Sequence, residues 1–331
     1  MELRRILVPL DGSARAMAVL PLVQVFAETS GASVHLLGVL DPQHPEWEGG
    51  ELRPLACEQP HRQLTAAAER LRARGIAVNV LLRPGKPAET ITALAEELDA
   101  DLLALATRGR GGFTRLLLGS VADAVVRRSS KPVLLVSPLE ADEHARSVTL
   151  RRVLLPLDGS SFAEQAVPLA GTVAHLLDAE LVLARVEPFG PVWPYGVAPD
   201  AEGALEQLTG RAAQRYLEQA QQRLPVKVVS SAVVLRGAPQ AMLTTFVGQN
   251  DVGLVVMATH GRSGLGRLVI GSVADAIIRT GTPTLLLPPA AARTAWSPLA
   301  GDDTADGTRA NALASELQED IPNASGGGSR W

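Results

Sequence analysis

The chain of 331 residues has one cysteine, Cys57, which cannot form a disulfide within the chain and which we expect in a loop. No cysteine and histidine residues show zinc-site spacing, which fits a reducing compartment. Long apolar runs are also lacking, because the first one stops at Pro9 and predicts neither a signal peptide nor a membrane span. We therefore expect a cytoplasmic protein without a membrane partner.

The sequence has no large excess of one charge. Its net charge is −4 and its basic residues are scattered as pairs, so no basic face is predicted and nucleic acid is not expected as a partner. It also lacks a nucleophile elbow, a Walker lysine, a metal-ligand motif and a dinucleotide fingerprint after its first strand. We predict that the protein is not an enzyme and that any ATP hydrolysis is slow and incidental.

What the chain does contain is a repeat. LALATRGRGGFTRLLLGSVADAVVRRSSKPVLLV begins at Leu103, and VVMATHGRSGLGRLVIGSVADAIIRTGTPTLLL begins at Val255. Upstream, ILVPLDGS begins at Ile6 and VLLPLDGS at Val153. Matches of this length predict two tandem copies of one domain, at 1–140 and 148–289. The remaining tail, 290–331, is rich in Ala, Asp, Gly and Ser, which predicts disorder.

Each copy alternates short apolar runs with helical patterns. The runs lack clean alternation, which is typical of strands covered on both faces in a parallel sheet. The order βαβαβαβαβ predicts right-handed crossovers and an open, doubly wound α/β sheet in each copy. Segments 41–60 and 187–203 are expected to be surface loops, each with one tryptophan, Trp47 or Trp193. The expected strands are 6–10, 33–40, 76–82, 101–107, 132–136, 152–157, 180–186, 226–235, 251–259 and 283–287. The expected helices are 14–29, 61–74, 87–98, 119–129, 161–177, 205–223, 239–249 and 271–280.

Repeated motifs follow two of the expected strands in each copy, at the ends where open α/β sheets bind ligands. Asp-Gly-Ser follows the first strand, from Asp11 and from Asp158. After the fourth strand, Gly109 and Gly261 are each followed by nine residues and then Gly-Ser. A helix that opens at this Gly-Ser presents free N–H groups, which favour phosphate. Basic loop residues could offset the charge of a polyphosphate: Arg108, Arg110, Arg115, His260, Arg262 and Arg267.

A purely structural interpretation of the same residues stays open. Ser120 with Asp123, and Ser272 with Asp275, have the spacing of a helix capping box, and Ser161 with Glu164 fits that box more closely. Asp11 and Asp158 could likewise only cap a helix or brace a turn. These serines and aspartates would then need no ligand.

VPLDGS after the first strand, with G-x9-G-S before the last helix and SKPVLLV or GTPTLLL after it, resembles the universal stress protein family over residues 3–288. The resemblance implies two five-stranded parallel sheets of order 3-2-1-4-5, with an adenine nucleotide alpha hydrolase-like fold, joined through their last strands into an internal pseudo-dimer. The resemblance leaves open whether two chains associate into a further homodimer, and it identifies no protein partner.

Many members of this family bind ATP through G-x2-G-x9-G-[S/T], with the first-strand aspartate and a residue ending the second strand holding adenosine. The resemblance therefore implies ATP as ligand, with Mg²⁺ at its phosphates as an option. The residues so assigned are Pro9, Asp11, Val39, Ala106, Arg108, Gly109, Gly119, Ser120 and Val121 in the first copy, and Pro156, Asp158, Val186, Ala258, His260, Gly261, Gly271, Ser272 and Val273 in the second.

Ala106 and Ala258 replace the first glycine of the family pattern. If the backbone there required a positive φ, an alanine would cost about 1 kcal/mol or more. The leading hypothesis is a nucleotide-binding stress-response sensor or regulator, and the alternative is an interaction scaffold that binds no nucleotide. An enzyme such as an ATP pyrophosphatase is disfavoured, because the serine- and glycine-rich loop that this chemistry needs after the first strand is absent.

Overall fold

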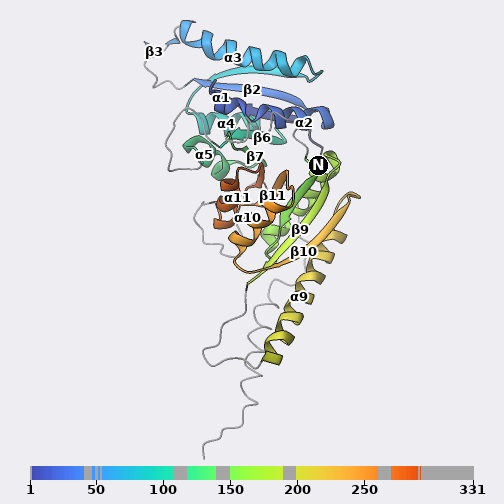
Figure 1. The fold of residues 1–331 in the computed structure, drawn as a ribbon. Coiled ribbons are helices and arrows are strands. Elements are labelled where there is room, and N and C mark those ends of the chain that lie inside the picture. Colours follow the sequence, from blue (N-terminus) through green and yellow to red (C-terminus); the bar gives the residue numbers. More distant parts are fainter. Residues whose placement is uncertain are drawn as a thin grey trace, which may run out of the picture. The chain divides into compact units, whose positions relative to one another are not determined.

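The computed structural model describes residues 2–40, 47–48, 51–52, 54–107, 118–138, 150–188, 199–259, 270–289 and 291. The first repeat alternates strands and helices as its sequence predicts, with a small two-stranded hairpin added after the second strand (Figure 1). Its elements are β1 (Arg5–Pro9), α1 (Ala14–Met17), α2 (Leu20–Ser30), β2 (Ser33–Leu40), β3 (Trp47–Glu48), β4 (Glu51–Leu52), α3 (Pro54–Arg72), β5 (Val78–Pro84), α4 (Pro87–Glu97), β6 (Leu102–Ala106), α5 (Ser120–Arg128) and β7 (Val133–Val136).

The second repeat has the same order of principal elements. Prolines stand in the first turn of α8 and α10, as they do in α2 and α4 of the first repeat, where the first N–H groups need no intrahelical acceptor. Its elements are β8 (Arg152–Pro156), α7 (Ser161–Glu164), α8 (Val167–Leu176), β9 (Glu180–Glu187), α9 (Pro199–Gln222), β10 (Ser230–Arg236), α10 (Pro239–Gln249), β11 (Leu254–Ala258), α11 (Ser272–Thr280) and β12 (Thr284–Leu287).

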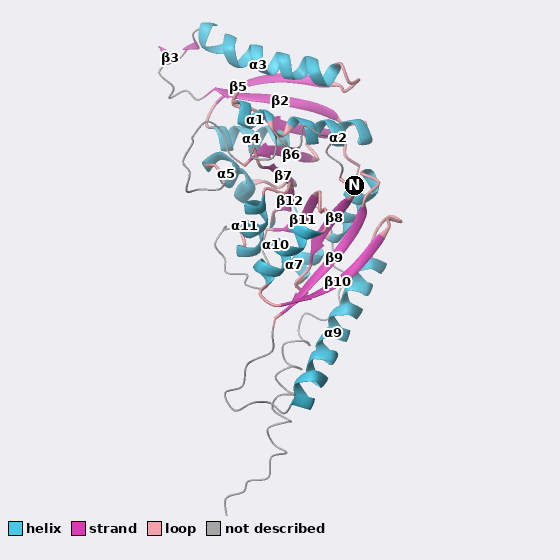
Figure 2. Cartoon of the chain, viewed as in Figure 1, coloured by secondary structure: helices cyan, strands magenta, loops and turns pink. Residues whose placement is uncertain are grey.

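The main strands form one ten-stranded sheet (Figure 2). Its order is β10-β9-β8-β11-β12-β7-β6-β1-β2-β5, which confirms the predicted 3-2-1-4-5 order in each half. Within each half all neighbouring strands are parallel. The halves join where β7 and β12 pair antiparallel, with Leu134 opposite Leu285. The sheet is therefore continuous through the last strand of each repeat.

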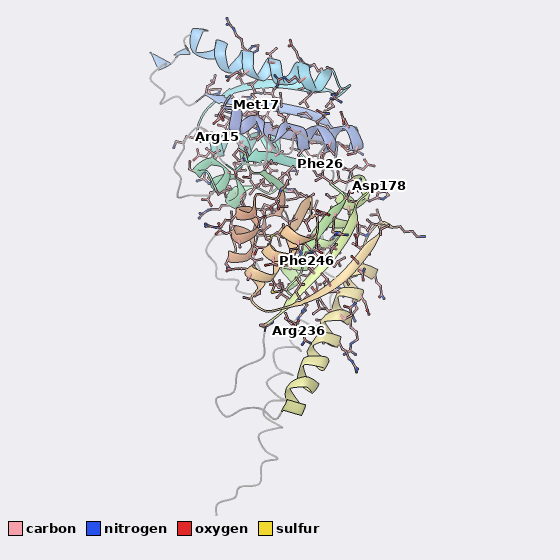
Figure 3. The ribbon with its side chains drawn as sticks, viewed as in Figure 1. Arg15, Met17, Phe26, Asp178, Arg236 and Phe246 are labelled. Carbon is pink, nitrogen blue, oxygen red and sulfur yellow. The ribbon has the colours of Figure 1, made fainter. Side chains whose placement is uncertain are left out.

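Helices cover both faces of the sheet, which explains why the strands lack clean alternation. In β1, Ile6 and Val8 belong to one core cluster and Leu7 to the other. The first cluster includes residues of α2, α3, α8 and α9, such as the buried Phe26 labelled in Figure 3. The second includes residues of α4, α5, α10 and α11. Because side chains alternate between faces along a strand, a strand covered on both faces must be apolar throughout.

Three predictions about local structure were wrong. The helices expected at 14–29 and 161–177 are each broken in two, because Pro21 and Pro168 lack the N–H that would continue the preceding turn. The expected surface loops are shorter than predicted, since α3 begins at Pro54 and α9 at Pro199, and the hairpin of β3 and β4 lies within the first of them. Cys57 lies in α3 rather than in a loop.

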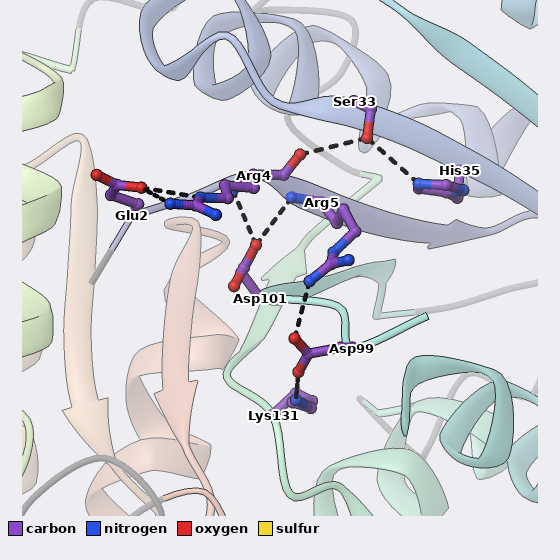
Figure 4. Close-up of polar contacts among 8 residues, drawn as sticks. All are labelled: Glu2, Arg4, Arg5, Ser33, His35, Asp99, Asp101 and Lys131. Carbon is purple, nitrogen blue, oxygen red and sulfur yellow. Dashed lines mark hydrogen bonds and ion pairs between the residues drawn. The ribbon is translucent and has the colours of Figure 1, made fainter. Parts of the chain in front are cut away.

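A polar cluster fixes the amino ends of the strands in the first half (Figure 4). One carboxylate oxygen of Asp101 accepts the backbone N–H groups of Arg4 and Arg5, at 2.8 and 2.9 Å. The Arg5 side chain donates to Asp99, which also pairs with Lys131. These contacts join β1 to the turn before β6, at the end of the strands away from the repeated Gly-Ser motifs.

Candidate functional site

The candidate site lies where the strand order changes direction. In the first half, β1 lies between β2 and β6. Its pairing with β6 covers only Ile6 with Leu102 and Leu7 with Leu103, although both strands continue beyond these residues. β8 and β11 pair over two residues in the same way. In open α/β sheets such a switch point at the strand carboxyl ends is where ligands bind. We call the residues around each of them the strand-end site.

The first wall of each strand-end site is the Asp-Gly-Ser turn. Asp11 Oδ1 accepts the backbone N–H of Ser13 at 2.9 Å, and Gly12 between them has φ +76°, which favours glycine. Ser13 Oγ in turn caps α1 by accepting the N–H of Ala16 at 3.1 Å. The turn of Asp158 repeats this geometry, with φ +83° at Gly159. Each aspartate therefore braces a turn, which fixes the direction of its carboxylate.

The second wall is the start of α5 or α11, and here the capping boxes that the structural interpretation offered do not form. Gly119 and Gly271 are the N-cap residues, and Ser120 and Ser272 are the first helical residues. Asp123 and Asp275 pair with arginines one turn further along instead of reaching back. The third box fails likewise, since Ser160 rather than Ser161 caps α7.

No side chain of the described residues caps α5 or α11. The first N–H groups of an α-helix have no intrahelical acceptor, so those of Ser120 and Val121 are left to another partner. Ser120 and Ser272 are exposed, while Val121 and Val273 are half-buried against the second core cluster. An exposed, uncapped helix start favours an anion, because the helix dipole adds to the free donors.

A backbone hydrogen bond ties each helix start to its strand. Gly119 N donates to Thr107 O at 2.6 Å, and Gly271 N donates to Thr259 O at 2.8 Å. Both threonines are buried, and neither was singled out from the sequence. The bond therefore holds the start of each helix beside the end of β6 or β11.

Ala106 and Ala258 are compatible with this geometry. Each ends a strand and pairs with the last strand of its half, opposite Val136 and Leu287. Neither is among the residues with a positive φ. The anticipated cost of replacing the first glycine of the pattern by alanine therefore does not arise from the backbone conformation.

The remaining assigned residues that the structure describes lie on β1, β2, β8 and β9. Pro9 and Pro156 end their strands and pair with Leu37 and Ala184. Val39 and Val186 are half-buried near the ends of β2 and β9, against the second core cluster. The predictions for Arg108, Gly109, His260 and Gly261, and for the loop arginines 110, 115, 262 and 267, lie outside the described residues.

A charged network in the second half has no counterpart among the predictions. The Arg185 side chain on β9 pairs with Glu187 at 2.5 Å and stacks over the ring of Tyr216 on α9 at 4.8 Å. Burial, followed by the nearby Glu164 carboxylate, raises the pKa of the Tyr216 hydroxyl. Only alignment of the two repeats could have pointed to it, since Arg185 stands where the first repeat has Gly38.

Comparison with known proteins shows the family of the chain. The model of the universal stress protein family matches residues 2–137 and 149–288. The chain belongs to the universal stress protein family. It is 26% identical over 298 residues to a universal stress protein of Mycolicibacterium smegmatis, covering 85% of this chain and 96% of that one. It is 30% identical over 234 residues to a universal stress protein of Mycobacterium tuberculosis, with 70% of each covered.

Solved structures show the same fold. A universal stress protein from Archaeoglobus fulgidus superposes with a TM-score of 0.62 at 21% identity, over 87% of this chain and 97% of that one.

Within the described residues, no helix is long and apolar enough to cross a membrane. No group of His, Cys, Asp and Glu in the same part of the chain is arranged to hold a metal ion.

Proposed function

We propose that this universal stress protein binds an adenine nucleotide, ATP in the first instance, at both strand-end sites. The observation that carries the proposal is duplicated: an exposed helix start, which no side chain of the described residues caps, is tied to a strand end and stands across the switch point from an aspartate turn. The free N–H groups and the serine hydroxyls, Ser120 and Ser272, suit phosphate oxygens. Mg²⁺ would then be held by the phosphates, since no protein ligand set for it is described.

The aspartates and valines suit the other end of the nucleotide. A carboxylate whose direction is fixed by its turn can accept hydrogen bonds from a ribose or an adenine amine, and Asp11 and Asp158 are such groups. Val39 and Val186 supply half-buried apolar surface on the neighbouring strand. Small-molecule sites commonly combine apolar walls with a few fixed polar groups in this way.

In this proposal the nucleotide is a signal and not a substrate. The bound nucleotide changes the surface that the two joined halves present to a protein partner, and hydrolysis is slow and incidental. The protein is then a stress-response regulator of the cytoplasm. A scaffold that binds no nucleotide is the competing function, and the next experiment separates the two.

The test begins with the purified protein, denatured and chromatographed to find released adenine nucleotide, followed by titration with ATP and Mg²⁺ in a calorimeter. We expect a stoichiometry of two and a rise in melting temperature, because a ligand that binds only the native state stabilises it. Asp11→Ala and Asp158→Ala should each remove one site. Glu97→Ala is the matched control, because Glu97 ends α4 and precedes the amino end of β6.

Absence of released nucleotide, of heat and of a melting shift at millimolar ATP would support the scaffold instead. Many turnovers of ATP per minute would contradict the regulatory role and indicate an enzyme.

A further inference from the structure

The two strand-end sites rest on different supports. Strand register matches Gly38 with Arg185, and sequence spacing from the aspartate turn matches Met17 with Glu164. In the first half this layer is apolar: Met17 (Figure 3) is packed against the first core cluster, and the place a side chain would take at Gly38 is filled by Leu64 and Leu82. In the second half the matching positions hold the charged residues Arg185 and Glu164.

The link to Asp158 runs through α7. Asp158 Oδ1 accepts both the N–H and the hydroxyl of Ser160, at 3.0 and 2.6 Å, and Ser160 Oγ accepts the N–H of Ala163. The direction of the Asp158 carboxylate therefore depends on where α7 lies. α7 has only four residues, and a single turn is not stable by itself in water, so tertiary contacts must hold it.

α9 provides the polar part of those contacts. Glu164, the last residue of α7, pairs with Arg223 directly after α9 at 3.0 Å, with side chains 21% and 54% exposed. Tyr216 of α9 lies near enough to Glu164 and Asp158 for both charges to act on its hydroxyl. Arg185 stacks on the same ring and is only 16% exposed, so its pairing with Glu187 is little screened by solvent. The Glu164–Arg223 pair thus joins α7 to the end of α9, and the Arg185–Tyr216 contact joins β9 to α9.

We propose that Glu164, Arg185 and Tyr216 are positioning residues for Asp158, so that nucleotide binding in the second half depends on α9 through an ionic network that the first half replaces by apolar packing. This inference rests on the proposed function. It makes the two sites unequal: the second responds to any partner or modification that moves α9, and the first does not respond through this network.

The test measures ATP affinity at one site at a time in the full-length protein. An Asp11→Ala background leaves the second site, and an Asp158→Ala background leaves the first. In the Asp11→Ala background, Glu164→Gln and Arg223→Gln should each weaken binding by roughly three- to ten-fold, the lower part of the range of coupling within one ion-pair network, because Arg223 is exposed. The double variant should lose no more than either single one. Glu218→Gln, which removes an exposed acid of α9 bonded to Gln214, is the matched control and should change nothing.

A charge swap, Glu164→Arg with Arg223→Glu, separates positioning from packing. Recovery of most of the affinity is expected if the ion pair is the link, and failure to recover would overturn the inference. Unchanged affinity in the single variants, with only a lower melting temperature, would show a merely structural role and leave the proposed function standing. If the protein without any substitution binds no ATP, the proposed function itself is contradicted.

Discussion

Gly38 offers the sharpest test of packing beneath the first strand-end site. A Cβ built at this position would lie 2.6 Å from Leu82 Cδ2 and 2.9 Å from Leu64 Cδ1. Leu64 is 1% exposed and has little room to move, whereas Leu82 is only partly buried. Overpacking of a core costs about 1–3 kcal/mol, while replacing glycine in a strand returns about 0.5–1 kcal/mol of backbone entropy. Gly38→Ala should therefore lower the free energy of unfolding by about 1 kcal/mol.

Gly248 is the matched control, because it lies within α10 with nothing within 4 Å of its Cβ position. Gly248→Ala should raise the free energy of unfolding by about 0.5–1 kcal/mol, since alanine is the better helix former. Urea unfolding followed by circular dichroism measures both, and the slopes should stay unchanged. Adding Leu82→Ala to Gly38→Ala should cost less than the sum of the two single effects. If Gly38→Ala stabilises the protein as much as Gly248→Ala does, the close packing described here is refuted.

Three further changes test the polar groups. Ser33→Glu should raise the free energy of unfolding by up to about 1 kcal/mol, with a slightly higher melting temperature. The buried Nε of Arg5 lacks a hydrogen-bond partner in the described structure, and a glutamate at position 33 would offer it a carboxylate, as Glu180 does for Arg152. Burial, and then Arg5, lowers the pKa of His35 below its usual 6.5, so the unfolded chain takes up a proton that the native protein does not. Stability should thus fall as pH drops below about 6.5, and His35→Val should flatten this slope in urea titrations at pH 8, 6 and 5. Tyr216→Phe should be neutral or stabilising by about 1 kcal/mol in the same assay, because the hydroxyl is buried with no hydrogen-bond partner in the described structure; a loss of more than 1 kcal/mol would show a bond to Glu164.

The positions of the strands could be predicted because the information is local and duplicated, whereas their order in the sheet was implied only by the family resemblance. Apolar runs such as 33–40 have the same limits in the structure, and the second copy repeats each signal independently. The helix breaks could also have been predicted, since Pro21 and Pro168 stand at matching positions. The apolar periodicity on either side of each proline concealed the interruption.

The site was harder to predict than the fold. Spacing correctly predicted that a helix opens at Gly119 and Ser120, but it could not tell a serine that caps a helix from one that follows a glycine cap. Whether the glycine or the serine is the N-cap depends on the backbone φ and ψ angles of these two neighbouring residues. The network of Glu164, Arg185 and Tyr216 was missed altogether, because its members are brought together by packing of three elements and share no motif.

The pairing of β7 with β12 has a consequence for any attempt to separate the repeats. β7 reads VLLV, and Val133, Leu134 and Leu135 are at most 1% exposed beside the partner strand. A sheet that ended at such a strand would present an unpaired, apolar edge, which is a template for aggregation. A repeat produced by itself would thus be driven to associate with a second copy of itself. Fusion in one chain supplies each repeat with its cover at a fixed local concentration.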